Sequence, residues 1–415
     1  MKGTRWLVAL ATSVVVGQEP IVPSSTSDMI AALASLEPEQ GWLGTPPGIS
    51  AEQWRYYRTR YALAPEGNEP DEARIALGQL LFFDKRLSRD RSLSCASCHD
   101  PKRGFADGRR TSIGIDGQTV TRNAPTVLNA GLQRRFFWDG RAASLEEQAA
   151  GPILNPAEMG MPSRESVVAR VREVAEYVGL FDLAYGREPQ FEDVARALAA
   201  FQRTLVFVDA PFDAFRAGQK DALSKDAQRG FELFAEHCRS CHPVSLREPL
   251  LSDGNFHNVG VGFERLDHQA LAREAFPKVR AADRGSSVAA SANIVPLYGE
   301  LGRALISKLE YQVGAFRTAP LRNIGLTAPY MHDGSMATLW HVVEHYNLGG
   351  TPNTWQDPQI QPLGLTPVEV DQVVAFLFSL TDRRLAEAND NEFARQRRLS
   401  QANPVRAIGP NKTAR

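Results

Sequence analysis

The sequence predicts a mostly α-helical protein made of two similar units, with long loops and little β-structure. Apolar residues recur every three to four positions in several segments, whereas convincing two-residue alternation is almost absent. A five-residue motif that contains all four cysteines occurs twice, at 95–99 and 238–242. Because the two copies lie about one domain length apart, each is expected to have a domain of its own.

The composition fits an ordinary globular protein of two or three domains. The chain has 415 residues, of which 43% are hydrophobic, so a fibre, a disordered chain and a mini-protein are excluded. Forty-seven Lys and Arg residues balance forty-eight Asp and Glu residues, which gives a net charge of −1. This balance argues against nucleic acid as a partner, because no global basic field is present.

The N-terminus has the pattern of an export signal. Lys2 and Arg5 precede an uncharged apolar stretch, 6–17, which is too short to span a membrane. We therefore expect residues 1–20 to be a signal segment. Because no clean cleavage site follows, an uncleaved segment that anchors the protein to the membrane is the alternative.

The four cysteines form two C-x-x-C-H motifs, which are Cys95, Cys98 and His99 in the first and Cys238, Cys241 and His242 in the second. Two thioethers from one helical turn hold the vinyl groups of a haem, and the adjacent His is its proximal iron ligand. The positions of the cysteines argue against two disulfides, and a zinc site or a redox dithiol is disfavoured because each C-x-x-C pair already carries its own histidine. We therefore expect two covalently bound haem c groups and, since such haems are attached after export, a periplasmic protein.

A helical segment precedes each motif. Residues 73–83 have a helical period, and a polar loop, 84–94, then delays the first cysteine pair. In 226–238, Gly230 shares one helical face with Phe234 and Cys238, so another helix can approach closely at the glycine. The two lead-in segments form a weak internal repeat of two cytochrome c-like units.

Two later helices complete the predicted core. The first covers 191–206 and has an apolar stripe made of Phe191, Val194, Leu198, Phe201 and Leu205. The second begins at Thr366, which forms a capping box with Glu369. Its predicted buried face consists of Val370, Val373, Val374, Leu377 and Leu380.

These features divide the chain into five parts. They are a signal segment (1–20), an N-terminal extension (21–70), a first haem domain (71–215), a second haem domain (216–385) and a polar tail (386–415). Long loops are expected at 104–122 and 249–262. The chain after Asp382 is low in apolar residues, which predicts a partly disordered tail.

The candidates for a second axial ligand are unevenly distributed. No histidine lies between Asp100 and Glu236, and the methionines there are Met159 and Met161. Unless one of these ligates, the first iron is five-coordinate and open to a small molecule such as peroxide. The second unit offers many candidates, which are Met331, His332, Met336, His341, His345 and Tyr346.

Several further segments resemble one family. They are RNAPTVLN at 122–129, FWDGRA at 137–142, Glu147-Gln148, GPILNPAEM at 151–159 and LRNIGLTAPYMHDG at 321–334. Together with the haem motifs, they resemble the bacterial di-haem cytochrome c peroxidases and their MauG relatives, over about 73–382. The resemblance implies that the first haem is peroxidatic and that the second transfers electrons.

The same resemblance assigns roles to individual residues. Trp138 matches the tryptophan between the two haems, and the distal pocket of the first haem falls on Gln148, Pro152 and Glu158. A calcium ion between the haems would take its ligands from Asn123, Thr327 and Pro329. The alternatives are purely structural roles. Glu158 would then be a solvated loop carboxylate, Trp138 an aromatic side chain packed on a haem edge, and Asn123 and Thr327 loop caps.

Two positions separate the branches of this family. Many of the peroxidases carry a blocking histidine ligand where this chain has Ile115, and they carry a methionine ligand of the second haem where it has Tyr346. MauG has tyrosine at the latter position, so both departures favour a MauG-like protein with a His/Tyr second haem. Met331 or His345 is the alternative ligand, with Tyr346 as a core residue.

The expected function is therefore a peroxidase that reduces hydrogen peroxide at an open first haem. Its partner would be a small redox protein that donates electrons, such as a cytochrome c or a cupredoxin, or a protein substrate that it oxidises. In this hypothesis Glu158 moves the proton of peroxide and Gln148 holds the bound oxygens. A non-catalytic di-haem electron carrier is the alternative, and the sequence leaves a homodimer open.

Overall fold

The computed structural model of the chain describes residues 50, 52, 64–245, 248–281 and 298–403. The expected signal segment, most of the N-terminal extension and the last twelve positions, 404–415, lie outside these ranges. The helices are α4 (Glu72–Phe83), α5 (Leu145–Leu154), α6 (Arg164–Arg172), α7 (Ala175–Tyr185), α8 (Phe191–Thr204), α9 (Pro211–Arg216), α10 (Lys225–His237), α11 (His268–Ala281), α13 (Ala304–Ser307), α14 (Leu339–Asn347), α15 (Pro367–Phe378) and α16 (Ala386–Ala402). Short 3-10 turns interrupt the loops between them.

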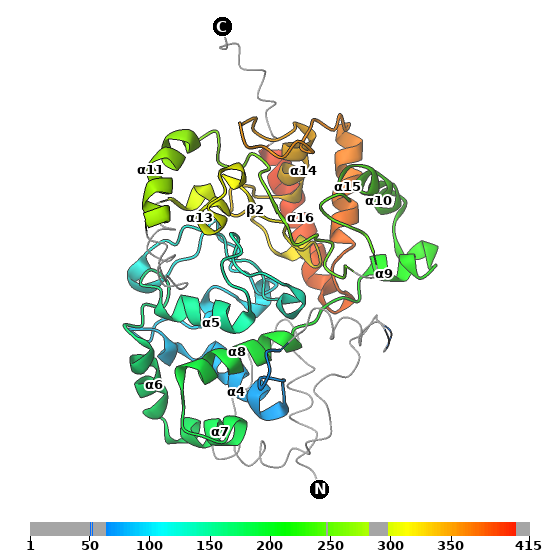
Figure 1. Ribbon diagram of the computed structural model, residues 1–415. Helices are drawn as coiled ribbons and strands as arrows, with labels where there is room; N and C mark the ends of the chain where they lie inside the picture. Colours follow the sequence, from blue (N-terminus) through cyan, green and yellow to red (C-terminus); the bar gives the residue numbers. More distant parts are fainter. Residues whose placement is uncertain (1–49, 51, 53–63, 246–247, 282–297, 404–415) are drawn as a thin grey trace.

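The predicted fold class is confirmed. Helices α4 to α8 form one half of the molecule, and helices α10 to α16 form the other half (Figure 1). The strands of the described chain are β1 (Phe256–His257) and β2 (Phe316–Arg317), which pair antiparallel with Phe256 opposite Arg317. Long loops thus carry much of the chain around the two helical halves.

The two halves repeat one packing arrangement. The helix before each cysteine motif packs on a later helix, α4 on α8 and α10 on α15. A Cβ atom at Gly230 would lie 1.8 Å from the backbone oxygen of Gln372 in α15, and one at Gly78 would lie 1.8 Å from that of Ala197 in α8. The close helix approach predicted at Gly230 is therefore present, and Gly78 supplies it in the first half.

The later helices form for the reasons that the sequence indicates. The apolar stripe predicted for 191–206 is buried, although α8 ends at Thr204. At the start of α15, the Thr366 hydroxyl accepts a hydrogen bond from the Glu369 amide, and the Glu369 carboxylate accepts one from the Thr366 amide. The five positions predicted for the inner face of this helix are also buried.

The apolar cores follow the two halves. One cluster gathers side chains of α4 to α8, and a second gathers side chains of α10, α14 and α15, together with Phe212 of α9. A third, smaller cluster lies around α11 and α13. The division between the first two clusters falls close to the predicted domain boundary, but the five-part division itself stays a prediction.

The expectation of a disordered tail after Asp382 is wrong for the described residues. Helix α16 covers Ala386–Ala402 and packs on α14. Gln396 is fully buried, where its amide accepts a hydrogen bond from the Leu339 backbone and donates to the Gly325 oxygen. Phe393 packs on the rings of Trp340 and Phe378. A few anchoring side chains dock this helix although its composition is polar.

No helix among the described residues is both long and apolar enough to cross a membrane. The apolar stretch near the N-terminus, 6–17, lies outside the described residues.

Candidate haem centres

The first motif lies in a tight turn that follows the loop after α4. Cys95 opens a 3-10 turn, Cys95–Ser97, and the His99 backbone amide donates to the Cys95 oxygen at 3.0 Å. The Nδ1 atom of His99 lies 3.2 Å from the carbonyl oxygen of Phe105. Burial lowers the pKa of His99, which favours the neutral imidazole.

The second motif repeats this geometry. Cys238 directly follows α10, and the His242 amide donates to the Cys238 oxygen at 2.9 Å. The Nδ1 atom of His242 lies 2.7 Å from the Leu251 oxygen, and burial lowers the pKa of His242. A carbonyl at Nδ1 holds the proton there and leaves Nε2 free to bind iron. Both histidines are therefore prepared as proximal ligands.

The four cysteines are not joined in disulfides. Burial raises the pKa of Cys95 to about 12 and that of Cys238 to about 12. The unattached side chains are therefore neutral thiols at neutral pH, whereas redox dithiols have a lowered pKa. The arrangement fits thioether attachment of a haem.

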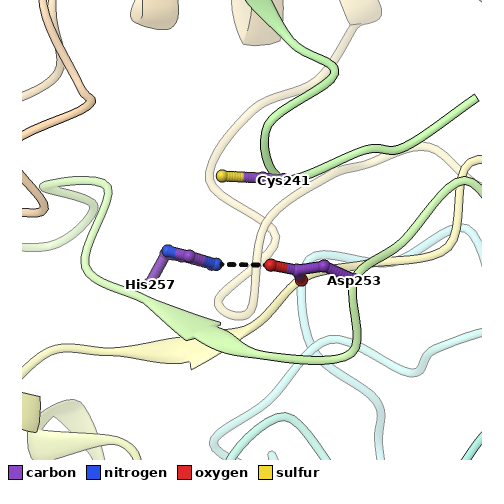
Figure 2. Close-up of side chains that lie close together, drawn as sticks. All are labelled: Cys241, Asp253 and His257. Atoms are coloured by element: carbon purple, nitrogen blue, oxygen red, sulfur yellow. Dashed lines mark hydrogen bonds and ion pairs between the residues drawn. The ribbon is translucent and has the colours of Figure 1, made fainter.

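One cluster near the second motif has the residue types of a metal site. Figure 2 shows Cys241 pointing toward the pair formed by His257 and Asp253. However, both ring nitrogens of His257 are engaged, Nε2 with Asp253 at 3.0 Å and Nδ1 with Asp357 at 2.6 Å. Cys241 is also an expected haem-attachment residue, so this cluster is better explained as an ion-pair network beside the second motif.

A cavity of about 240 Å³ lies against the second motif. Its wall includes Cys238, Cys241 and His242. Much of the remaining wall is apolar, with Leu233, Phe234, Val261, Leu339, Val343, Val373 and Leu377. Such a wall suits a haem macrocycle, and the thiols and imidazole expected to hold a c-type haem line the same cavity.

The six candidates for the second axial ligand of this haem are not equivalent. Met331, His332 and Tyr346 line the cavity, but His332 is bonded to Glu300 at 3.1 Å and stacks on Phe316. The rings of the other two histidines face backbone oxygens, His345 that of Val259 and His341 that of Asn403. Met336 packs against the second apolar cluster.

Met331 and Tyr346 are left as candidates in the cavity wall, and Tyr346 is the one that the sequence favours. It is on α14, and no hydrogen bond of its hydroxyl to a described residue is present. Burial, together with the two cysteines of the second motif, raises its pKa. An iron ion would have to supply the positive charge that stabilises the phenolate.

Trp138 lies in the wall of the same cavity and belongs to the first half of the chain. Its indole Nε1 donates to the Asn123 oxygen at 2.9 Å, and its own backbone oxygen accepts from the Arg317 amide at 2.8 Å. Trp138 therefore connects the Asn123 segment with β2.

The residues expected at the distal side of the first haem come from α5 and the loop after it. Gln148 and Pro152 are on α5, and Glu158 follows on the loop. The Asn155 side-chain amide donates to the Glu158 Oε1 atom at 2.8 Å. Burial raises the pKa of Glu158, although Arg141 and Asn155 oppose the shift. A carboxyl group with a raised pKa is suited to proton transfer near neutral pH.

Ile115 is fully buried beside this loop. Its backbone amide donates to the Glu158 oxygen at 2.8 Å, and Asp116 forms an ion pair with Arg89. The two methionines of the first half, Met159 and Met161, are buried in the first apolar cluster. The loop that carries Ile115 is thus fastened to the Glu158 segment.

The expected calcium ligands lie together at the same cavity. The Asn123 side-chain nitrogen donates to the Arg109 oxygen at 3.0 Å, which leaves its amide oxygen for another partner. The Thr327 and Pro329 backbone oxygens accept no hydrogen bond from the described residues. Three free oxygens suit a hard cation such as Ca²⁺.

Sequence reasoning missed three residues of these centres. Asn155 positions Glu158 through a hydrogen bond. Arg141 stacks on Phe137 and opposes the rise in the pKa of the Glu158 carboxyl. Arg317 lines the cavity beside the second motif. Asn155 and Arg141 lie in the motifs that carry the family resemblance. Their spacing to Glu158 and Trp138 could therefore have identified them from the sequence. No sequence pattern identifies Arg317, because only its surroundings in the folded chain distinguish it from other arginines.

Comparison with known proteins decides the family. A family model described as di-haem cytochrome c peroxidase matches residues 72–221. The methylamine utilization protein MauG of Methylorubrum extorquens is 35% identical over 336 residues, which cover 80% of this chain and 85% of that protein. The chain belongs to the di-haem cytochrome c peroxidase family. The resemblance noted in the sequence is therefore confirmed.

Further members of the di-haem peroxidase family agree. A cytochrome-c peroxidase of Denitromonas iodatirespirans is 35% identical over 338 residues, with 76% of this chain and 84% of the relative covered. The solved structure of a MauG-like protein associated with microbial copper homeostasis has a TM-score of 0.65 and 31% identity, and covers 77% of this chain and 92% of its own. Membership makes the chain an oxidoreductase of the peroxidase type and implies two c-type haems.

Proposed function

We propose that this protein is a peroxide-reducing di-haem enzyme whose first iron is open without prior reduction. The observation that carries the proposal is Ile115, which occupies the position of the blocking histidine. The Ile115 side chain is fully buried, and its amide is bonded to the Glu158 oxygen. A hydrocarbon side chain cannot bind iron, and the loop that carries it is already fastened beside the distal residues.

A c-type haem with an open axial position supplies the redox chemistry of peroxide cleavage. The chain supplies the proton handling. Glu158 accepts the proton of the incoming peroxide and returns it to the leaving oxygen, Gln148 donates a hydrogen bond that holds the substrate, and Pro152 limits the space beside it. Asn155 fixes the Glu158 carboxylate through its 2.8 Å hydrogen bond.

His242 and Tyr346 would hold the iron of the second haem, which would supply electron transfer, and Trp138 lies in the wall of the same cavity. The support for Tyr346 is its place in the cavity wall and its lack of a hydrogen-bond partner among the described residues. A phenolate ligand stabilises ferric iron more than a thioether does, which favours the MauG-like branch. A calcium ion held by Asn123, Thr327 and Pro329 would lie at the same cavity.

The partner follows from this assignment. The enzyme would take electrons from a small redox protein, a cytochrome c or a cupredoxin, or oxidise a residue of a protein substrate as its MauG relatives suggest. Covalent haem attachment and the basic, apolar N-terminus favour a periplasmic location. An uncleaved N-terminal segment that anchors the protein is the alternative to a cleaved signal, and the sequence leaves a homodimer open.

Electron paramagnetic resonance of the ferric holoprotein, before any reductant is added, tests the open iron. We expect one high-spin and one low-spin haem. Two low-spin haems would overturn the proposal and favour a reduction-gated peroxidase or an electron carrier.

A pair of variants makes this test specific to position 115. Ile115→His restores a ligand where the blocking histidine stands, so it should convert the high-spin haem into a low-spin haem and lower peroxide turnover. Ile115→Asn is the matched control, since it is polar and of similar size but binds iron poorly. If the two variants keep the same high-spin signal, Ile115 does not face the first iron.

A further inference from the structure

Three arginines are buried among the described residues, and one of them lacks a carboxylate partner. Arg203 is paired with Glu146, and Arg322 with Asp213. Arg317 is 8% exposed, and its only side-chain hydrogen bond to a described residue is a long one of 3.5 Å to the Phe137 oxygen. A buried charge without a counter-charge is costly, so an anion is expected to be present in the complete protein.

The surroundings of Arg317 indicate where that anion comes from. Arg317 lies in the wall of the second haem cavity, on β2 opposite Phe256 of β1. The neighbouring His257 on β1 also lines this cavity, but Asp253 and Asp357 already compensate its charge. The short β ribbon therefore brings two cations to the cavity wall and leaves one of them without a protein carboxylate.

We propose that Arg317 binds a propionate carboxylate of the second haem and thereby sets the reduction potential of that haem. A c-type haem carries two propionates, and a guanidinium holds a carboxylate through two parallel hydrogen bonds. The inference rests on the second haem, which family membership implies, and not on the peroxide chemistry proposed for the first.

The pairing has a predictable electrostatic effect. With Arg317 present, the propionate stays ionised and its charge is balanced. Without the guanidinium, a buried carboxylate near the iron stabilises the ferric form and binds a proton more readily. The potential of the second haem should then be lower, and it should fall further with rising pH as the propionic acid ionises.

The test uses holoprotein with two haems per chain, counted by haem assay before any measurement. Arg317→Met removes the charge and keeps much of the volume, whereas Arg317→Lys keeps the charge. We expect Arg317→Met to lower the midpoint potential of the second haem and to make this potential depend on pH, whereas the potential of the unsubstituted protein stays constant with pH. Arg317→Lys should restore most of both properties.

Arg303→Met is the matched control. Arg303 is half-buried, stacks on Phe256 and donates to the Asp139 and Gly140 oxygens, but it does not line the cavity. The Arg303→Met substitution removes the same charge from the same region. We expect it to change the midpoint potential of the second haem and the pH dependence of that potential only a little. The histidines of the cavity wall, which are 237, 242, 257 and 332, are present in every variant, so their titration cancels in the comparison.

The outcomes are distinct from those of the proposed function. A second haem lost from Arg317→Met but retained in Arg317→Lys would support the pairing as well. An unchanged, pH-independent potential in Arg317→Met would overturn it, and so would a change confined to the first haem. Arg317→Lys behaving like Arg317→Met would overturn the role of charge. None of these results depends on whether peroxide is reduced.

Discussion

Substitution of Gly230 by alanine tests how the second haem motif is positioned. An added Cβ would lie 1.8 Å from the Gln372 oxygen and 2.4 Å from its carbonyl carbon. Because ordinary carbon contacts begin at about 3.4 Å, α10 and α15 would have to separate locally by roughly 1.5 Å. A backbone carbonyl cannot rotate away as a side chain can.

The magnitude follows from two opposing effects. Overpacking of a core costs about 1–3 kcal/mol, and the rigid contact places this site toward the upper end. Alanine gains about 0.5–1 kcal/mol over glycine within a helix. We therefore expect Gly230→Ala to lower the free energy of unfolding by about 2 kcal/mol. Since α10 ends immediately before Cys238, the second haem should also be attached less completely.

Denaturant unfolding of the holoprotein, followed by haem absorbance and by circular dichroism, measures this change. Gly179→Ala is the control, because Gly179 is exposed in the middle of α7 and should be stabilised by the same substitution. Gly78→Ala should destabilise the first half in the same way. If Gly230→Ala is as stable as the unsubstituted protein, the reasoning about close helix packing is refuted.

Four other predictions concern the haem centres. Glu158→Gln should slow peroxide cleavage in stopped-flow measurements by about 10²–10⁴-fold while both haems remain bound. Because burial raises the pKa of Glu158, the rate of the unsubstituted enzyme should rise with pH through a midpoint above the ordinary value of 4.5. A variant with the same pH profile would contradict the assignment. Tyr346→Met should raise the reduction potential of the low-spin haem and alter its absorption spectrum, whereas an unchanged spectrum would indicate another ligand. A calcium chelator should change the spectrum and activity of the ferric protein but have no further effect on Asn123→Ala; no response in either protein would remove the calcium site. His257→Asn should lose stability at low pH, because the hydrogen bond with Asp253 above all raises the pKa of His257. The contribution of His257 to stability is therefore complete below about pH 6.5 and is lost as the pH rises above that value. Thermal unfolding at several pH values should show a stability difference between variant and parent that shrinks as the pH rises, and a constant difference would contradict the prediction.

The sequence was sufficient for features that depend on local patterns. The helices at 191–206 and after Thr366 were predictable because their apolar spacing and capping residues act within a few positions. The cysteine motifs were likewise predictable, because the cysteines that attach a haem and the adjacent histidine lie within five positions. Both proximal histidines have a carbonyl oxygen at Nδ1, a detail that only the folded loops reveal.

The features that were missed depend on distant partners. Helix α16 reads as a disordered tail because its composition is polar, yet buried Gln396 satisfies backbone groups of two other segments. Composition cannot indicate such docking, since one amide with four hydrogen-bond partners contributes little to average hydropathy. Arg317 is a similar case, because the lack of a carboxylate partner for it among the described residues is a property of the tertiary structure alone.

The two halves share one helix arrangement but differ in what surrounds the haem motif, and this difference is the strongest argument for a division of labour. In the second half, α14 and the loop before it place Tyr346 and Met331 in the cavity wall, together with the unpaired cation of Arg317. In the first half, the corresponding chain contributes a buried isoleucine and a carboxyl group with a raised pKa. An enclosed, charge-compensated haem suits electron transfer, and an open haem beside a proton carrier suits peroxide chemistry. Duplicated packing with unequal loops is therefore enough to produce two different sites.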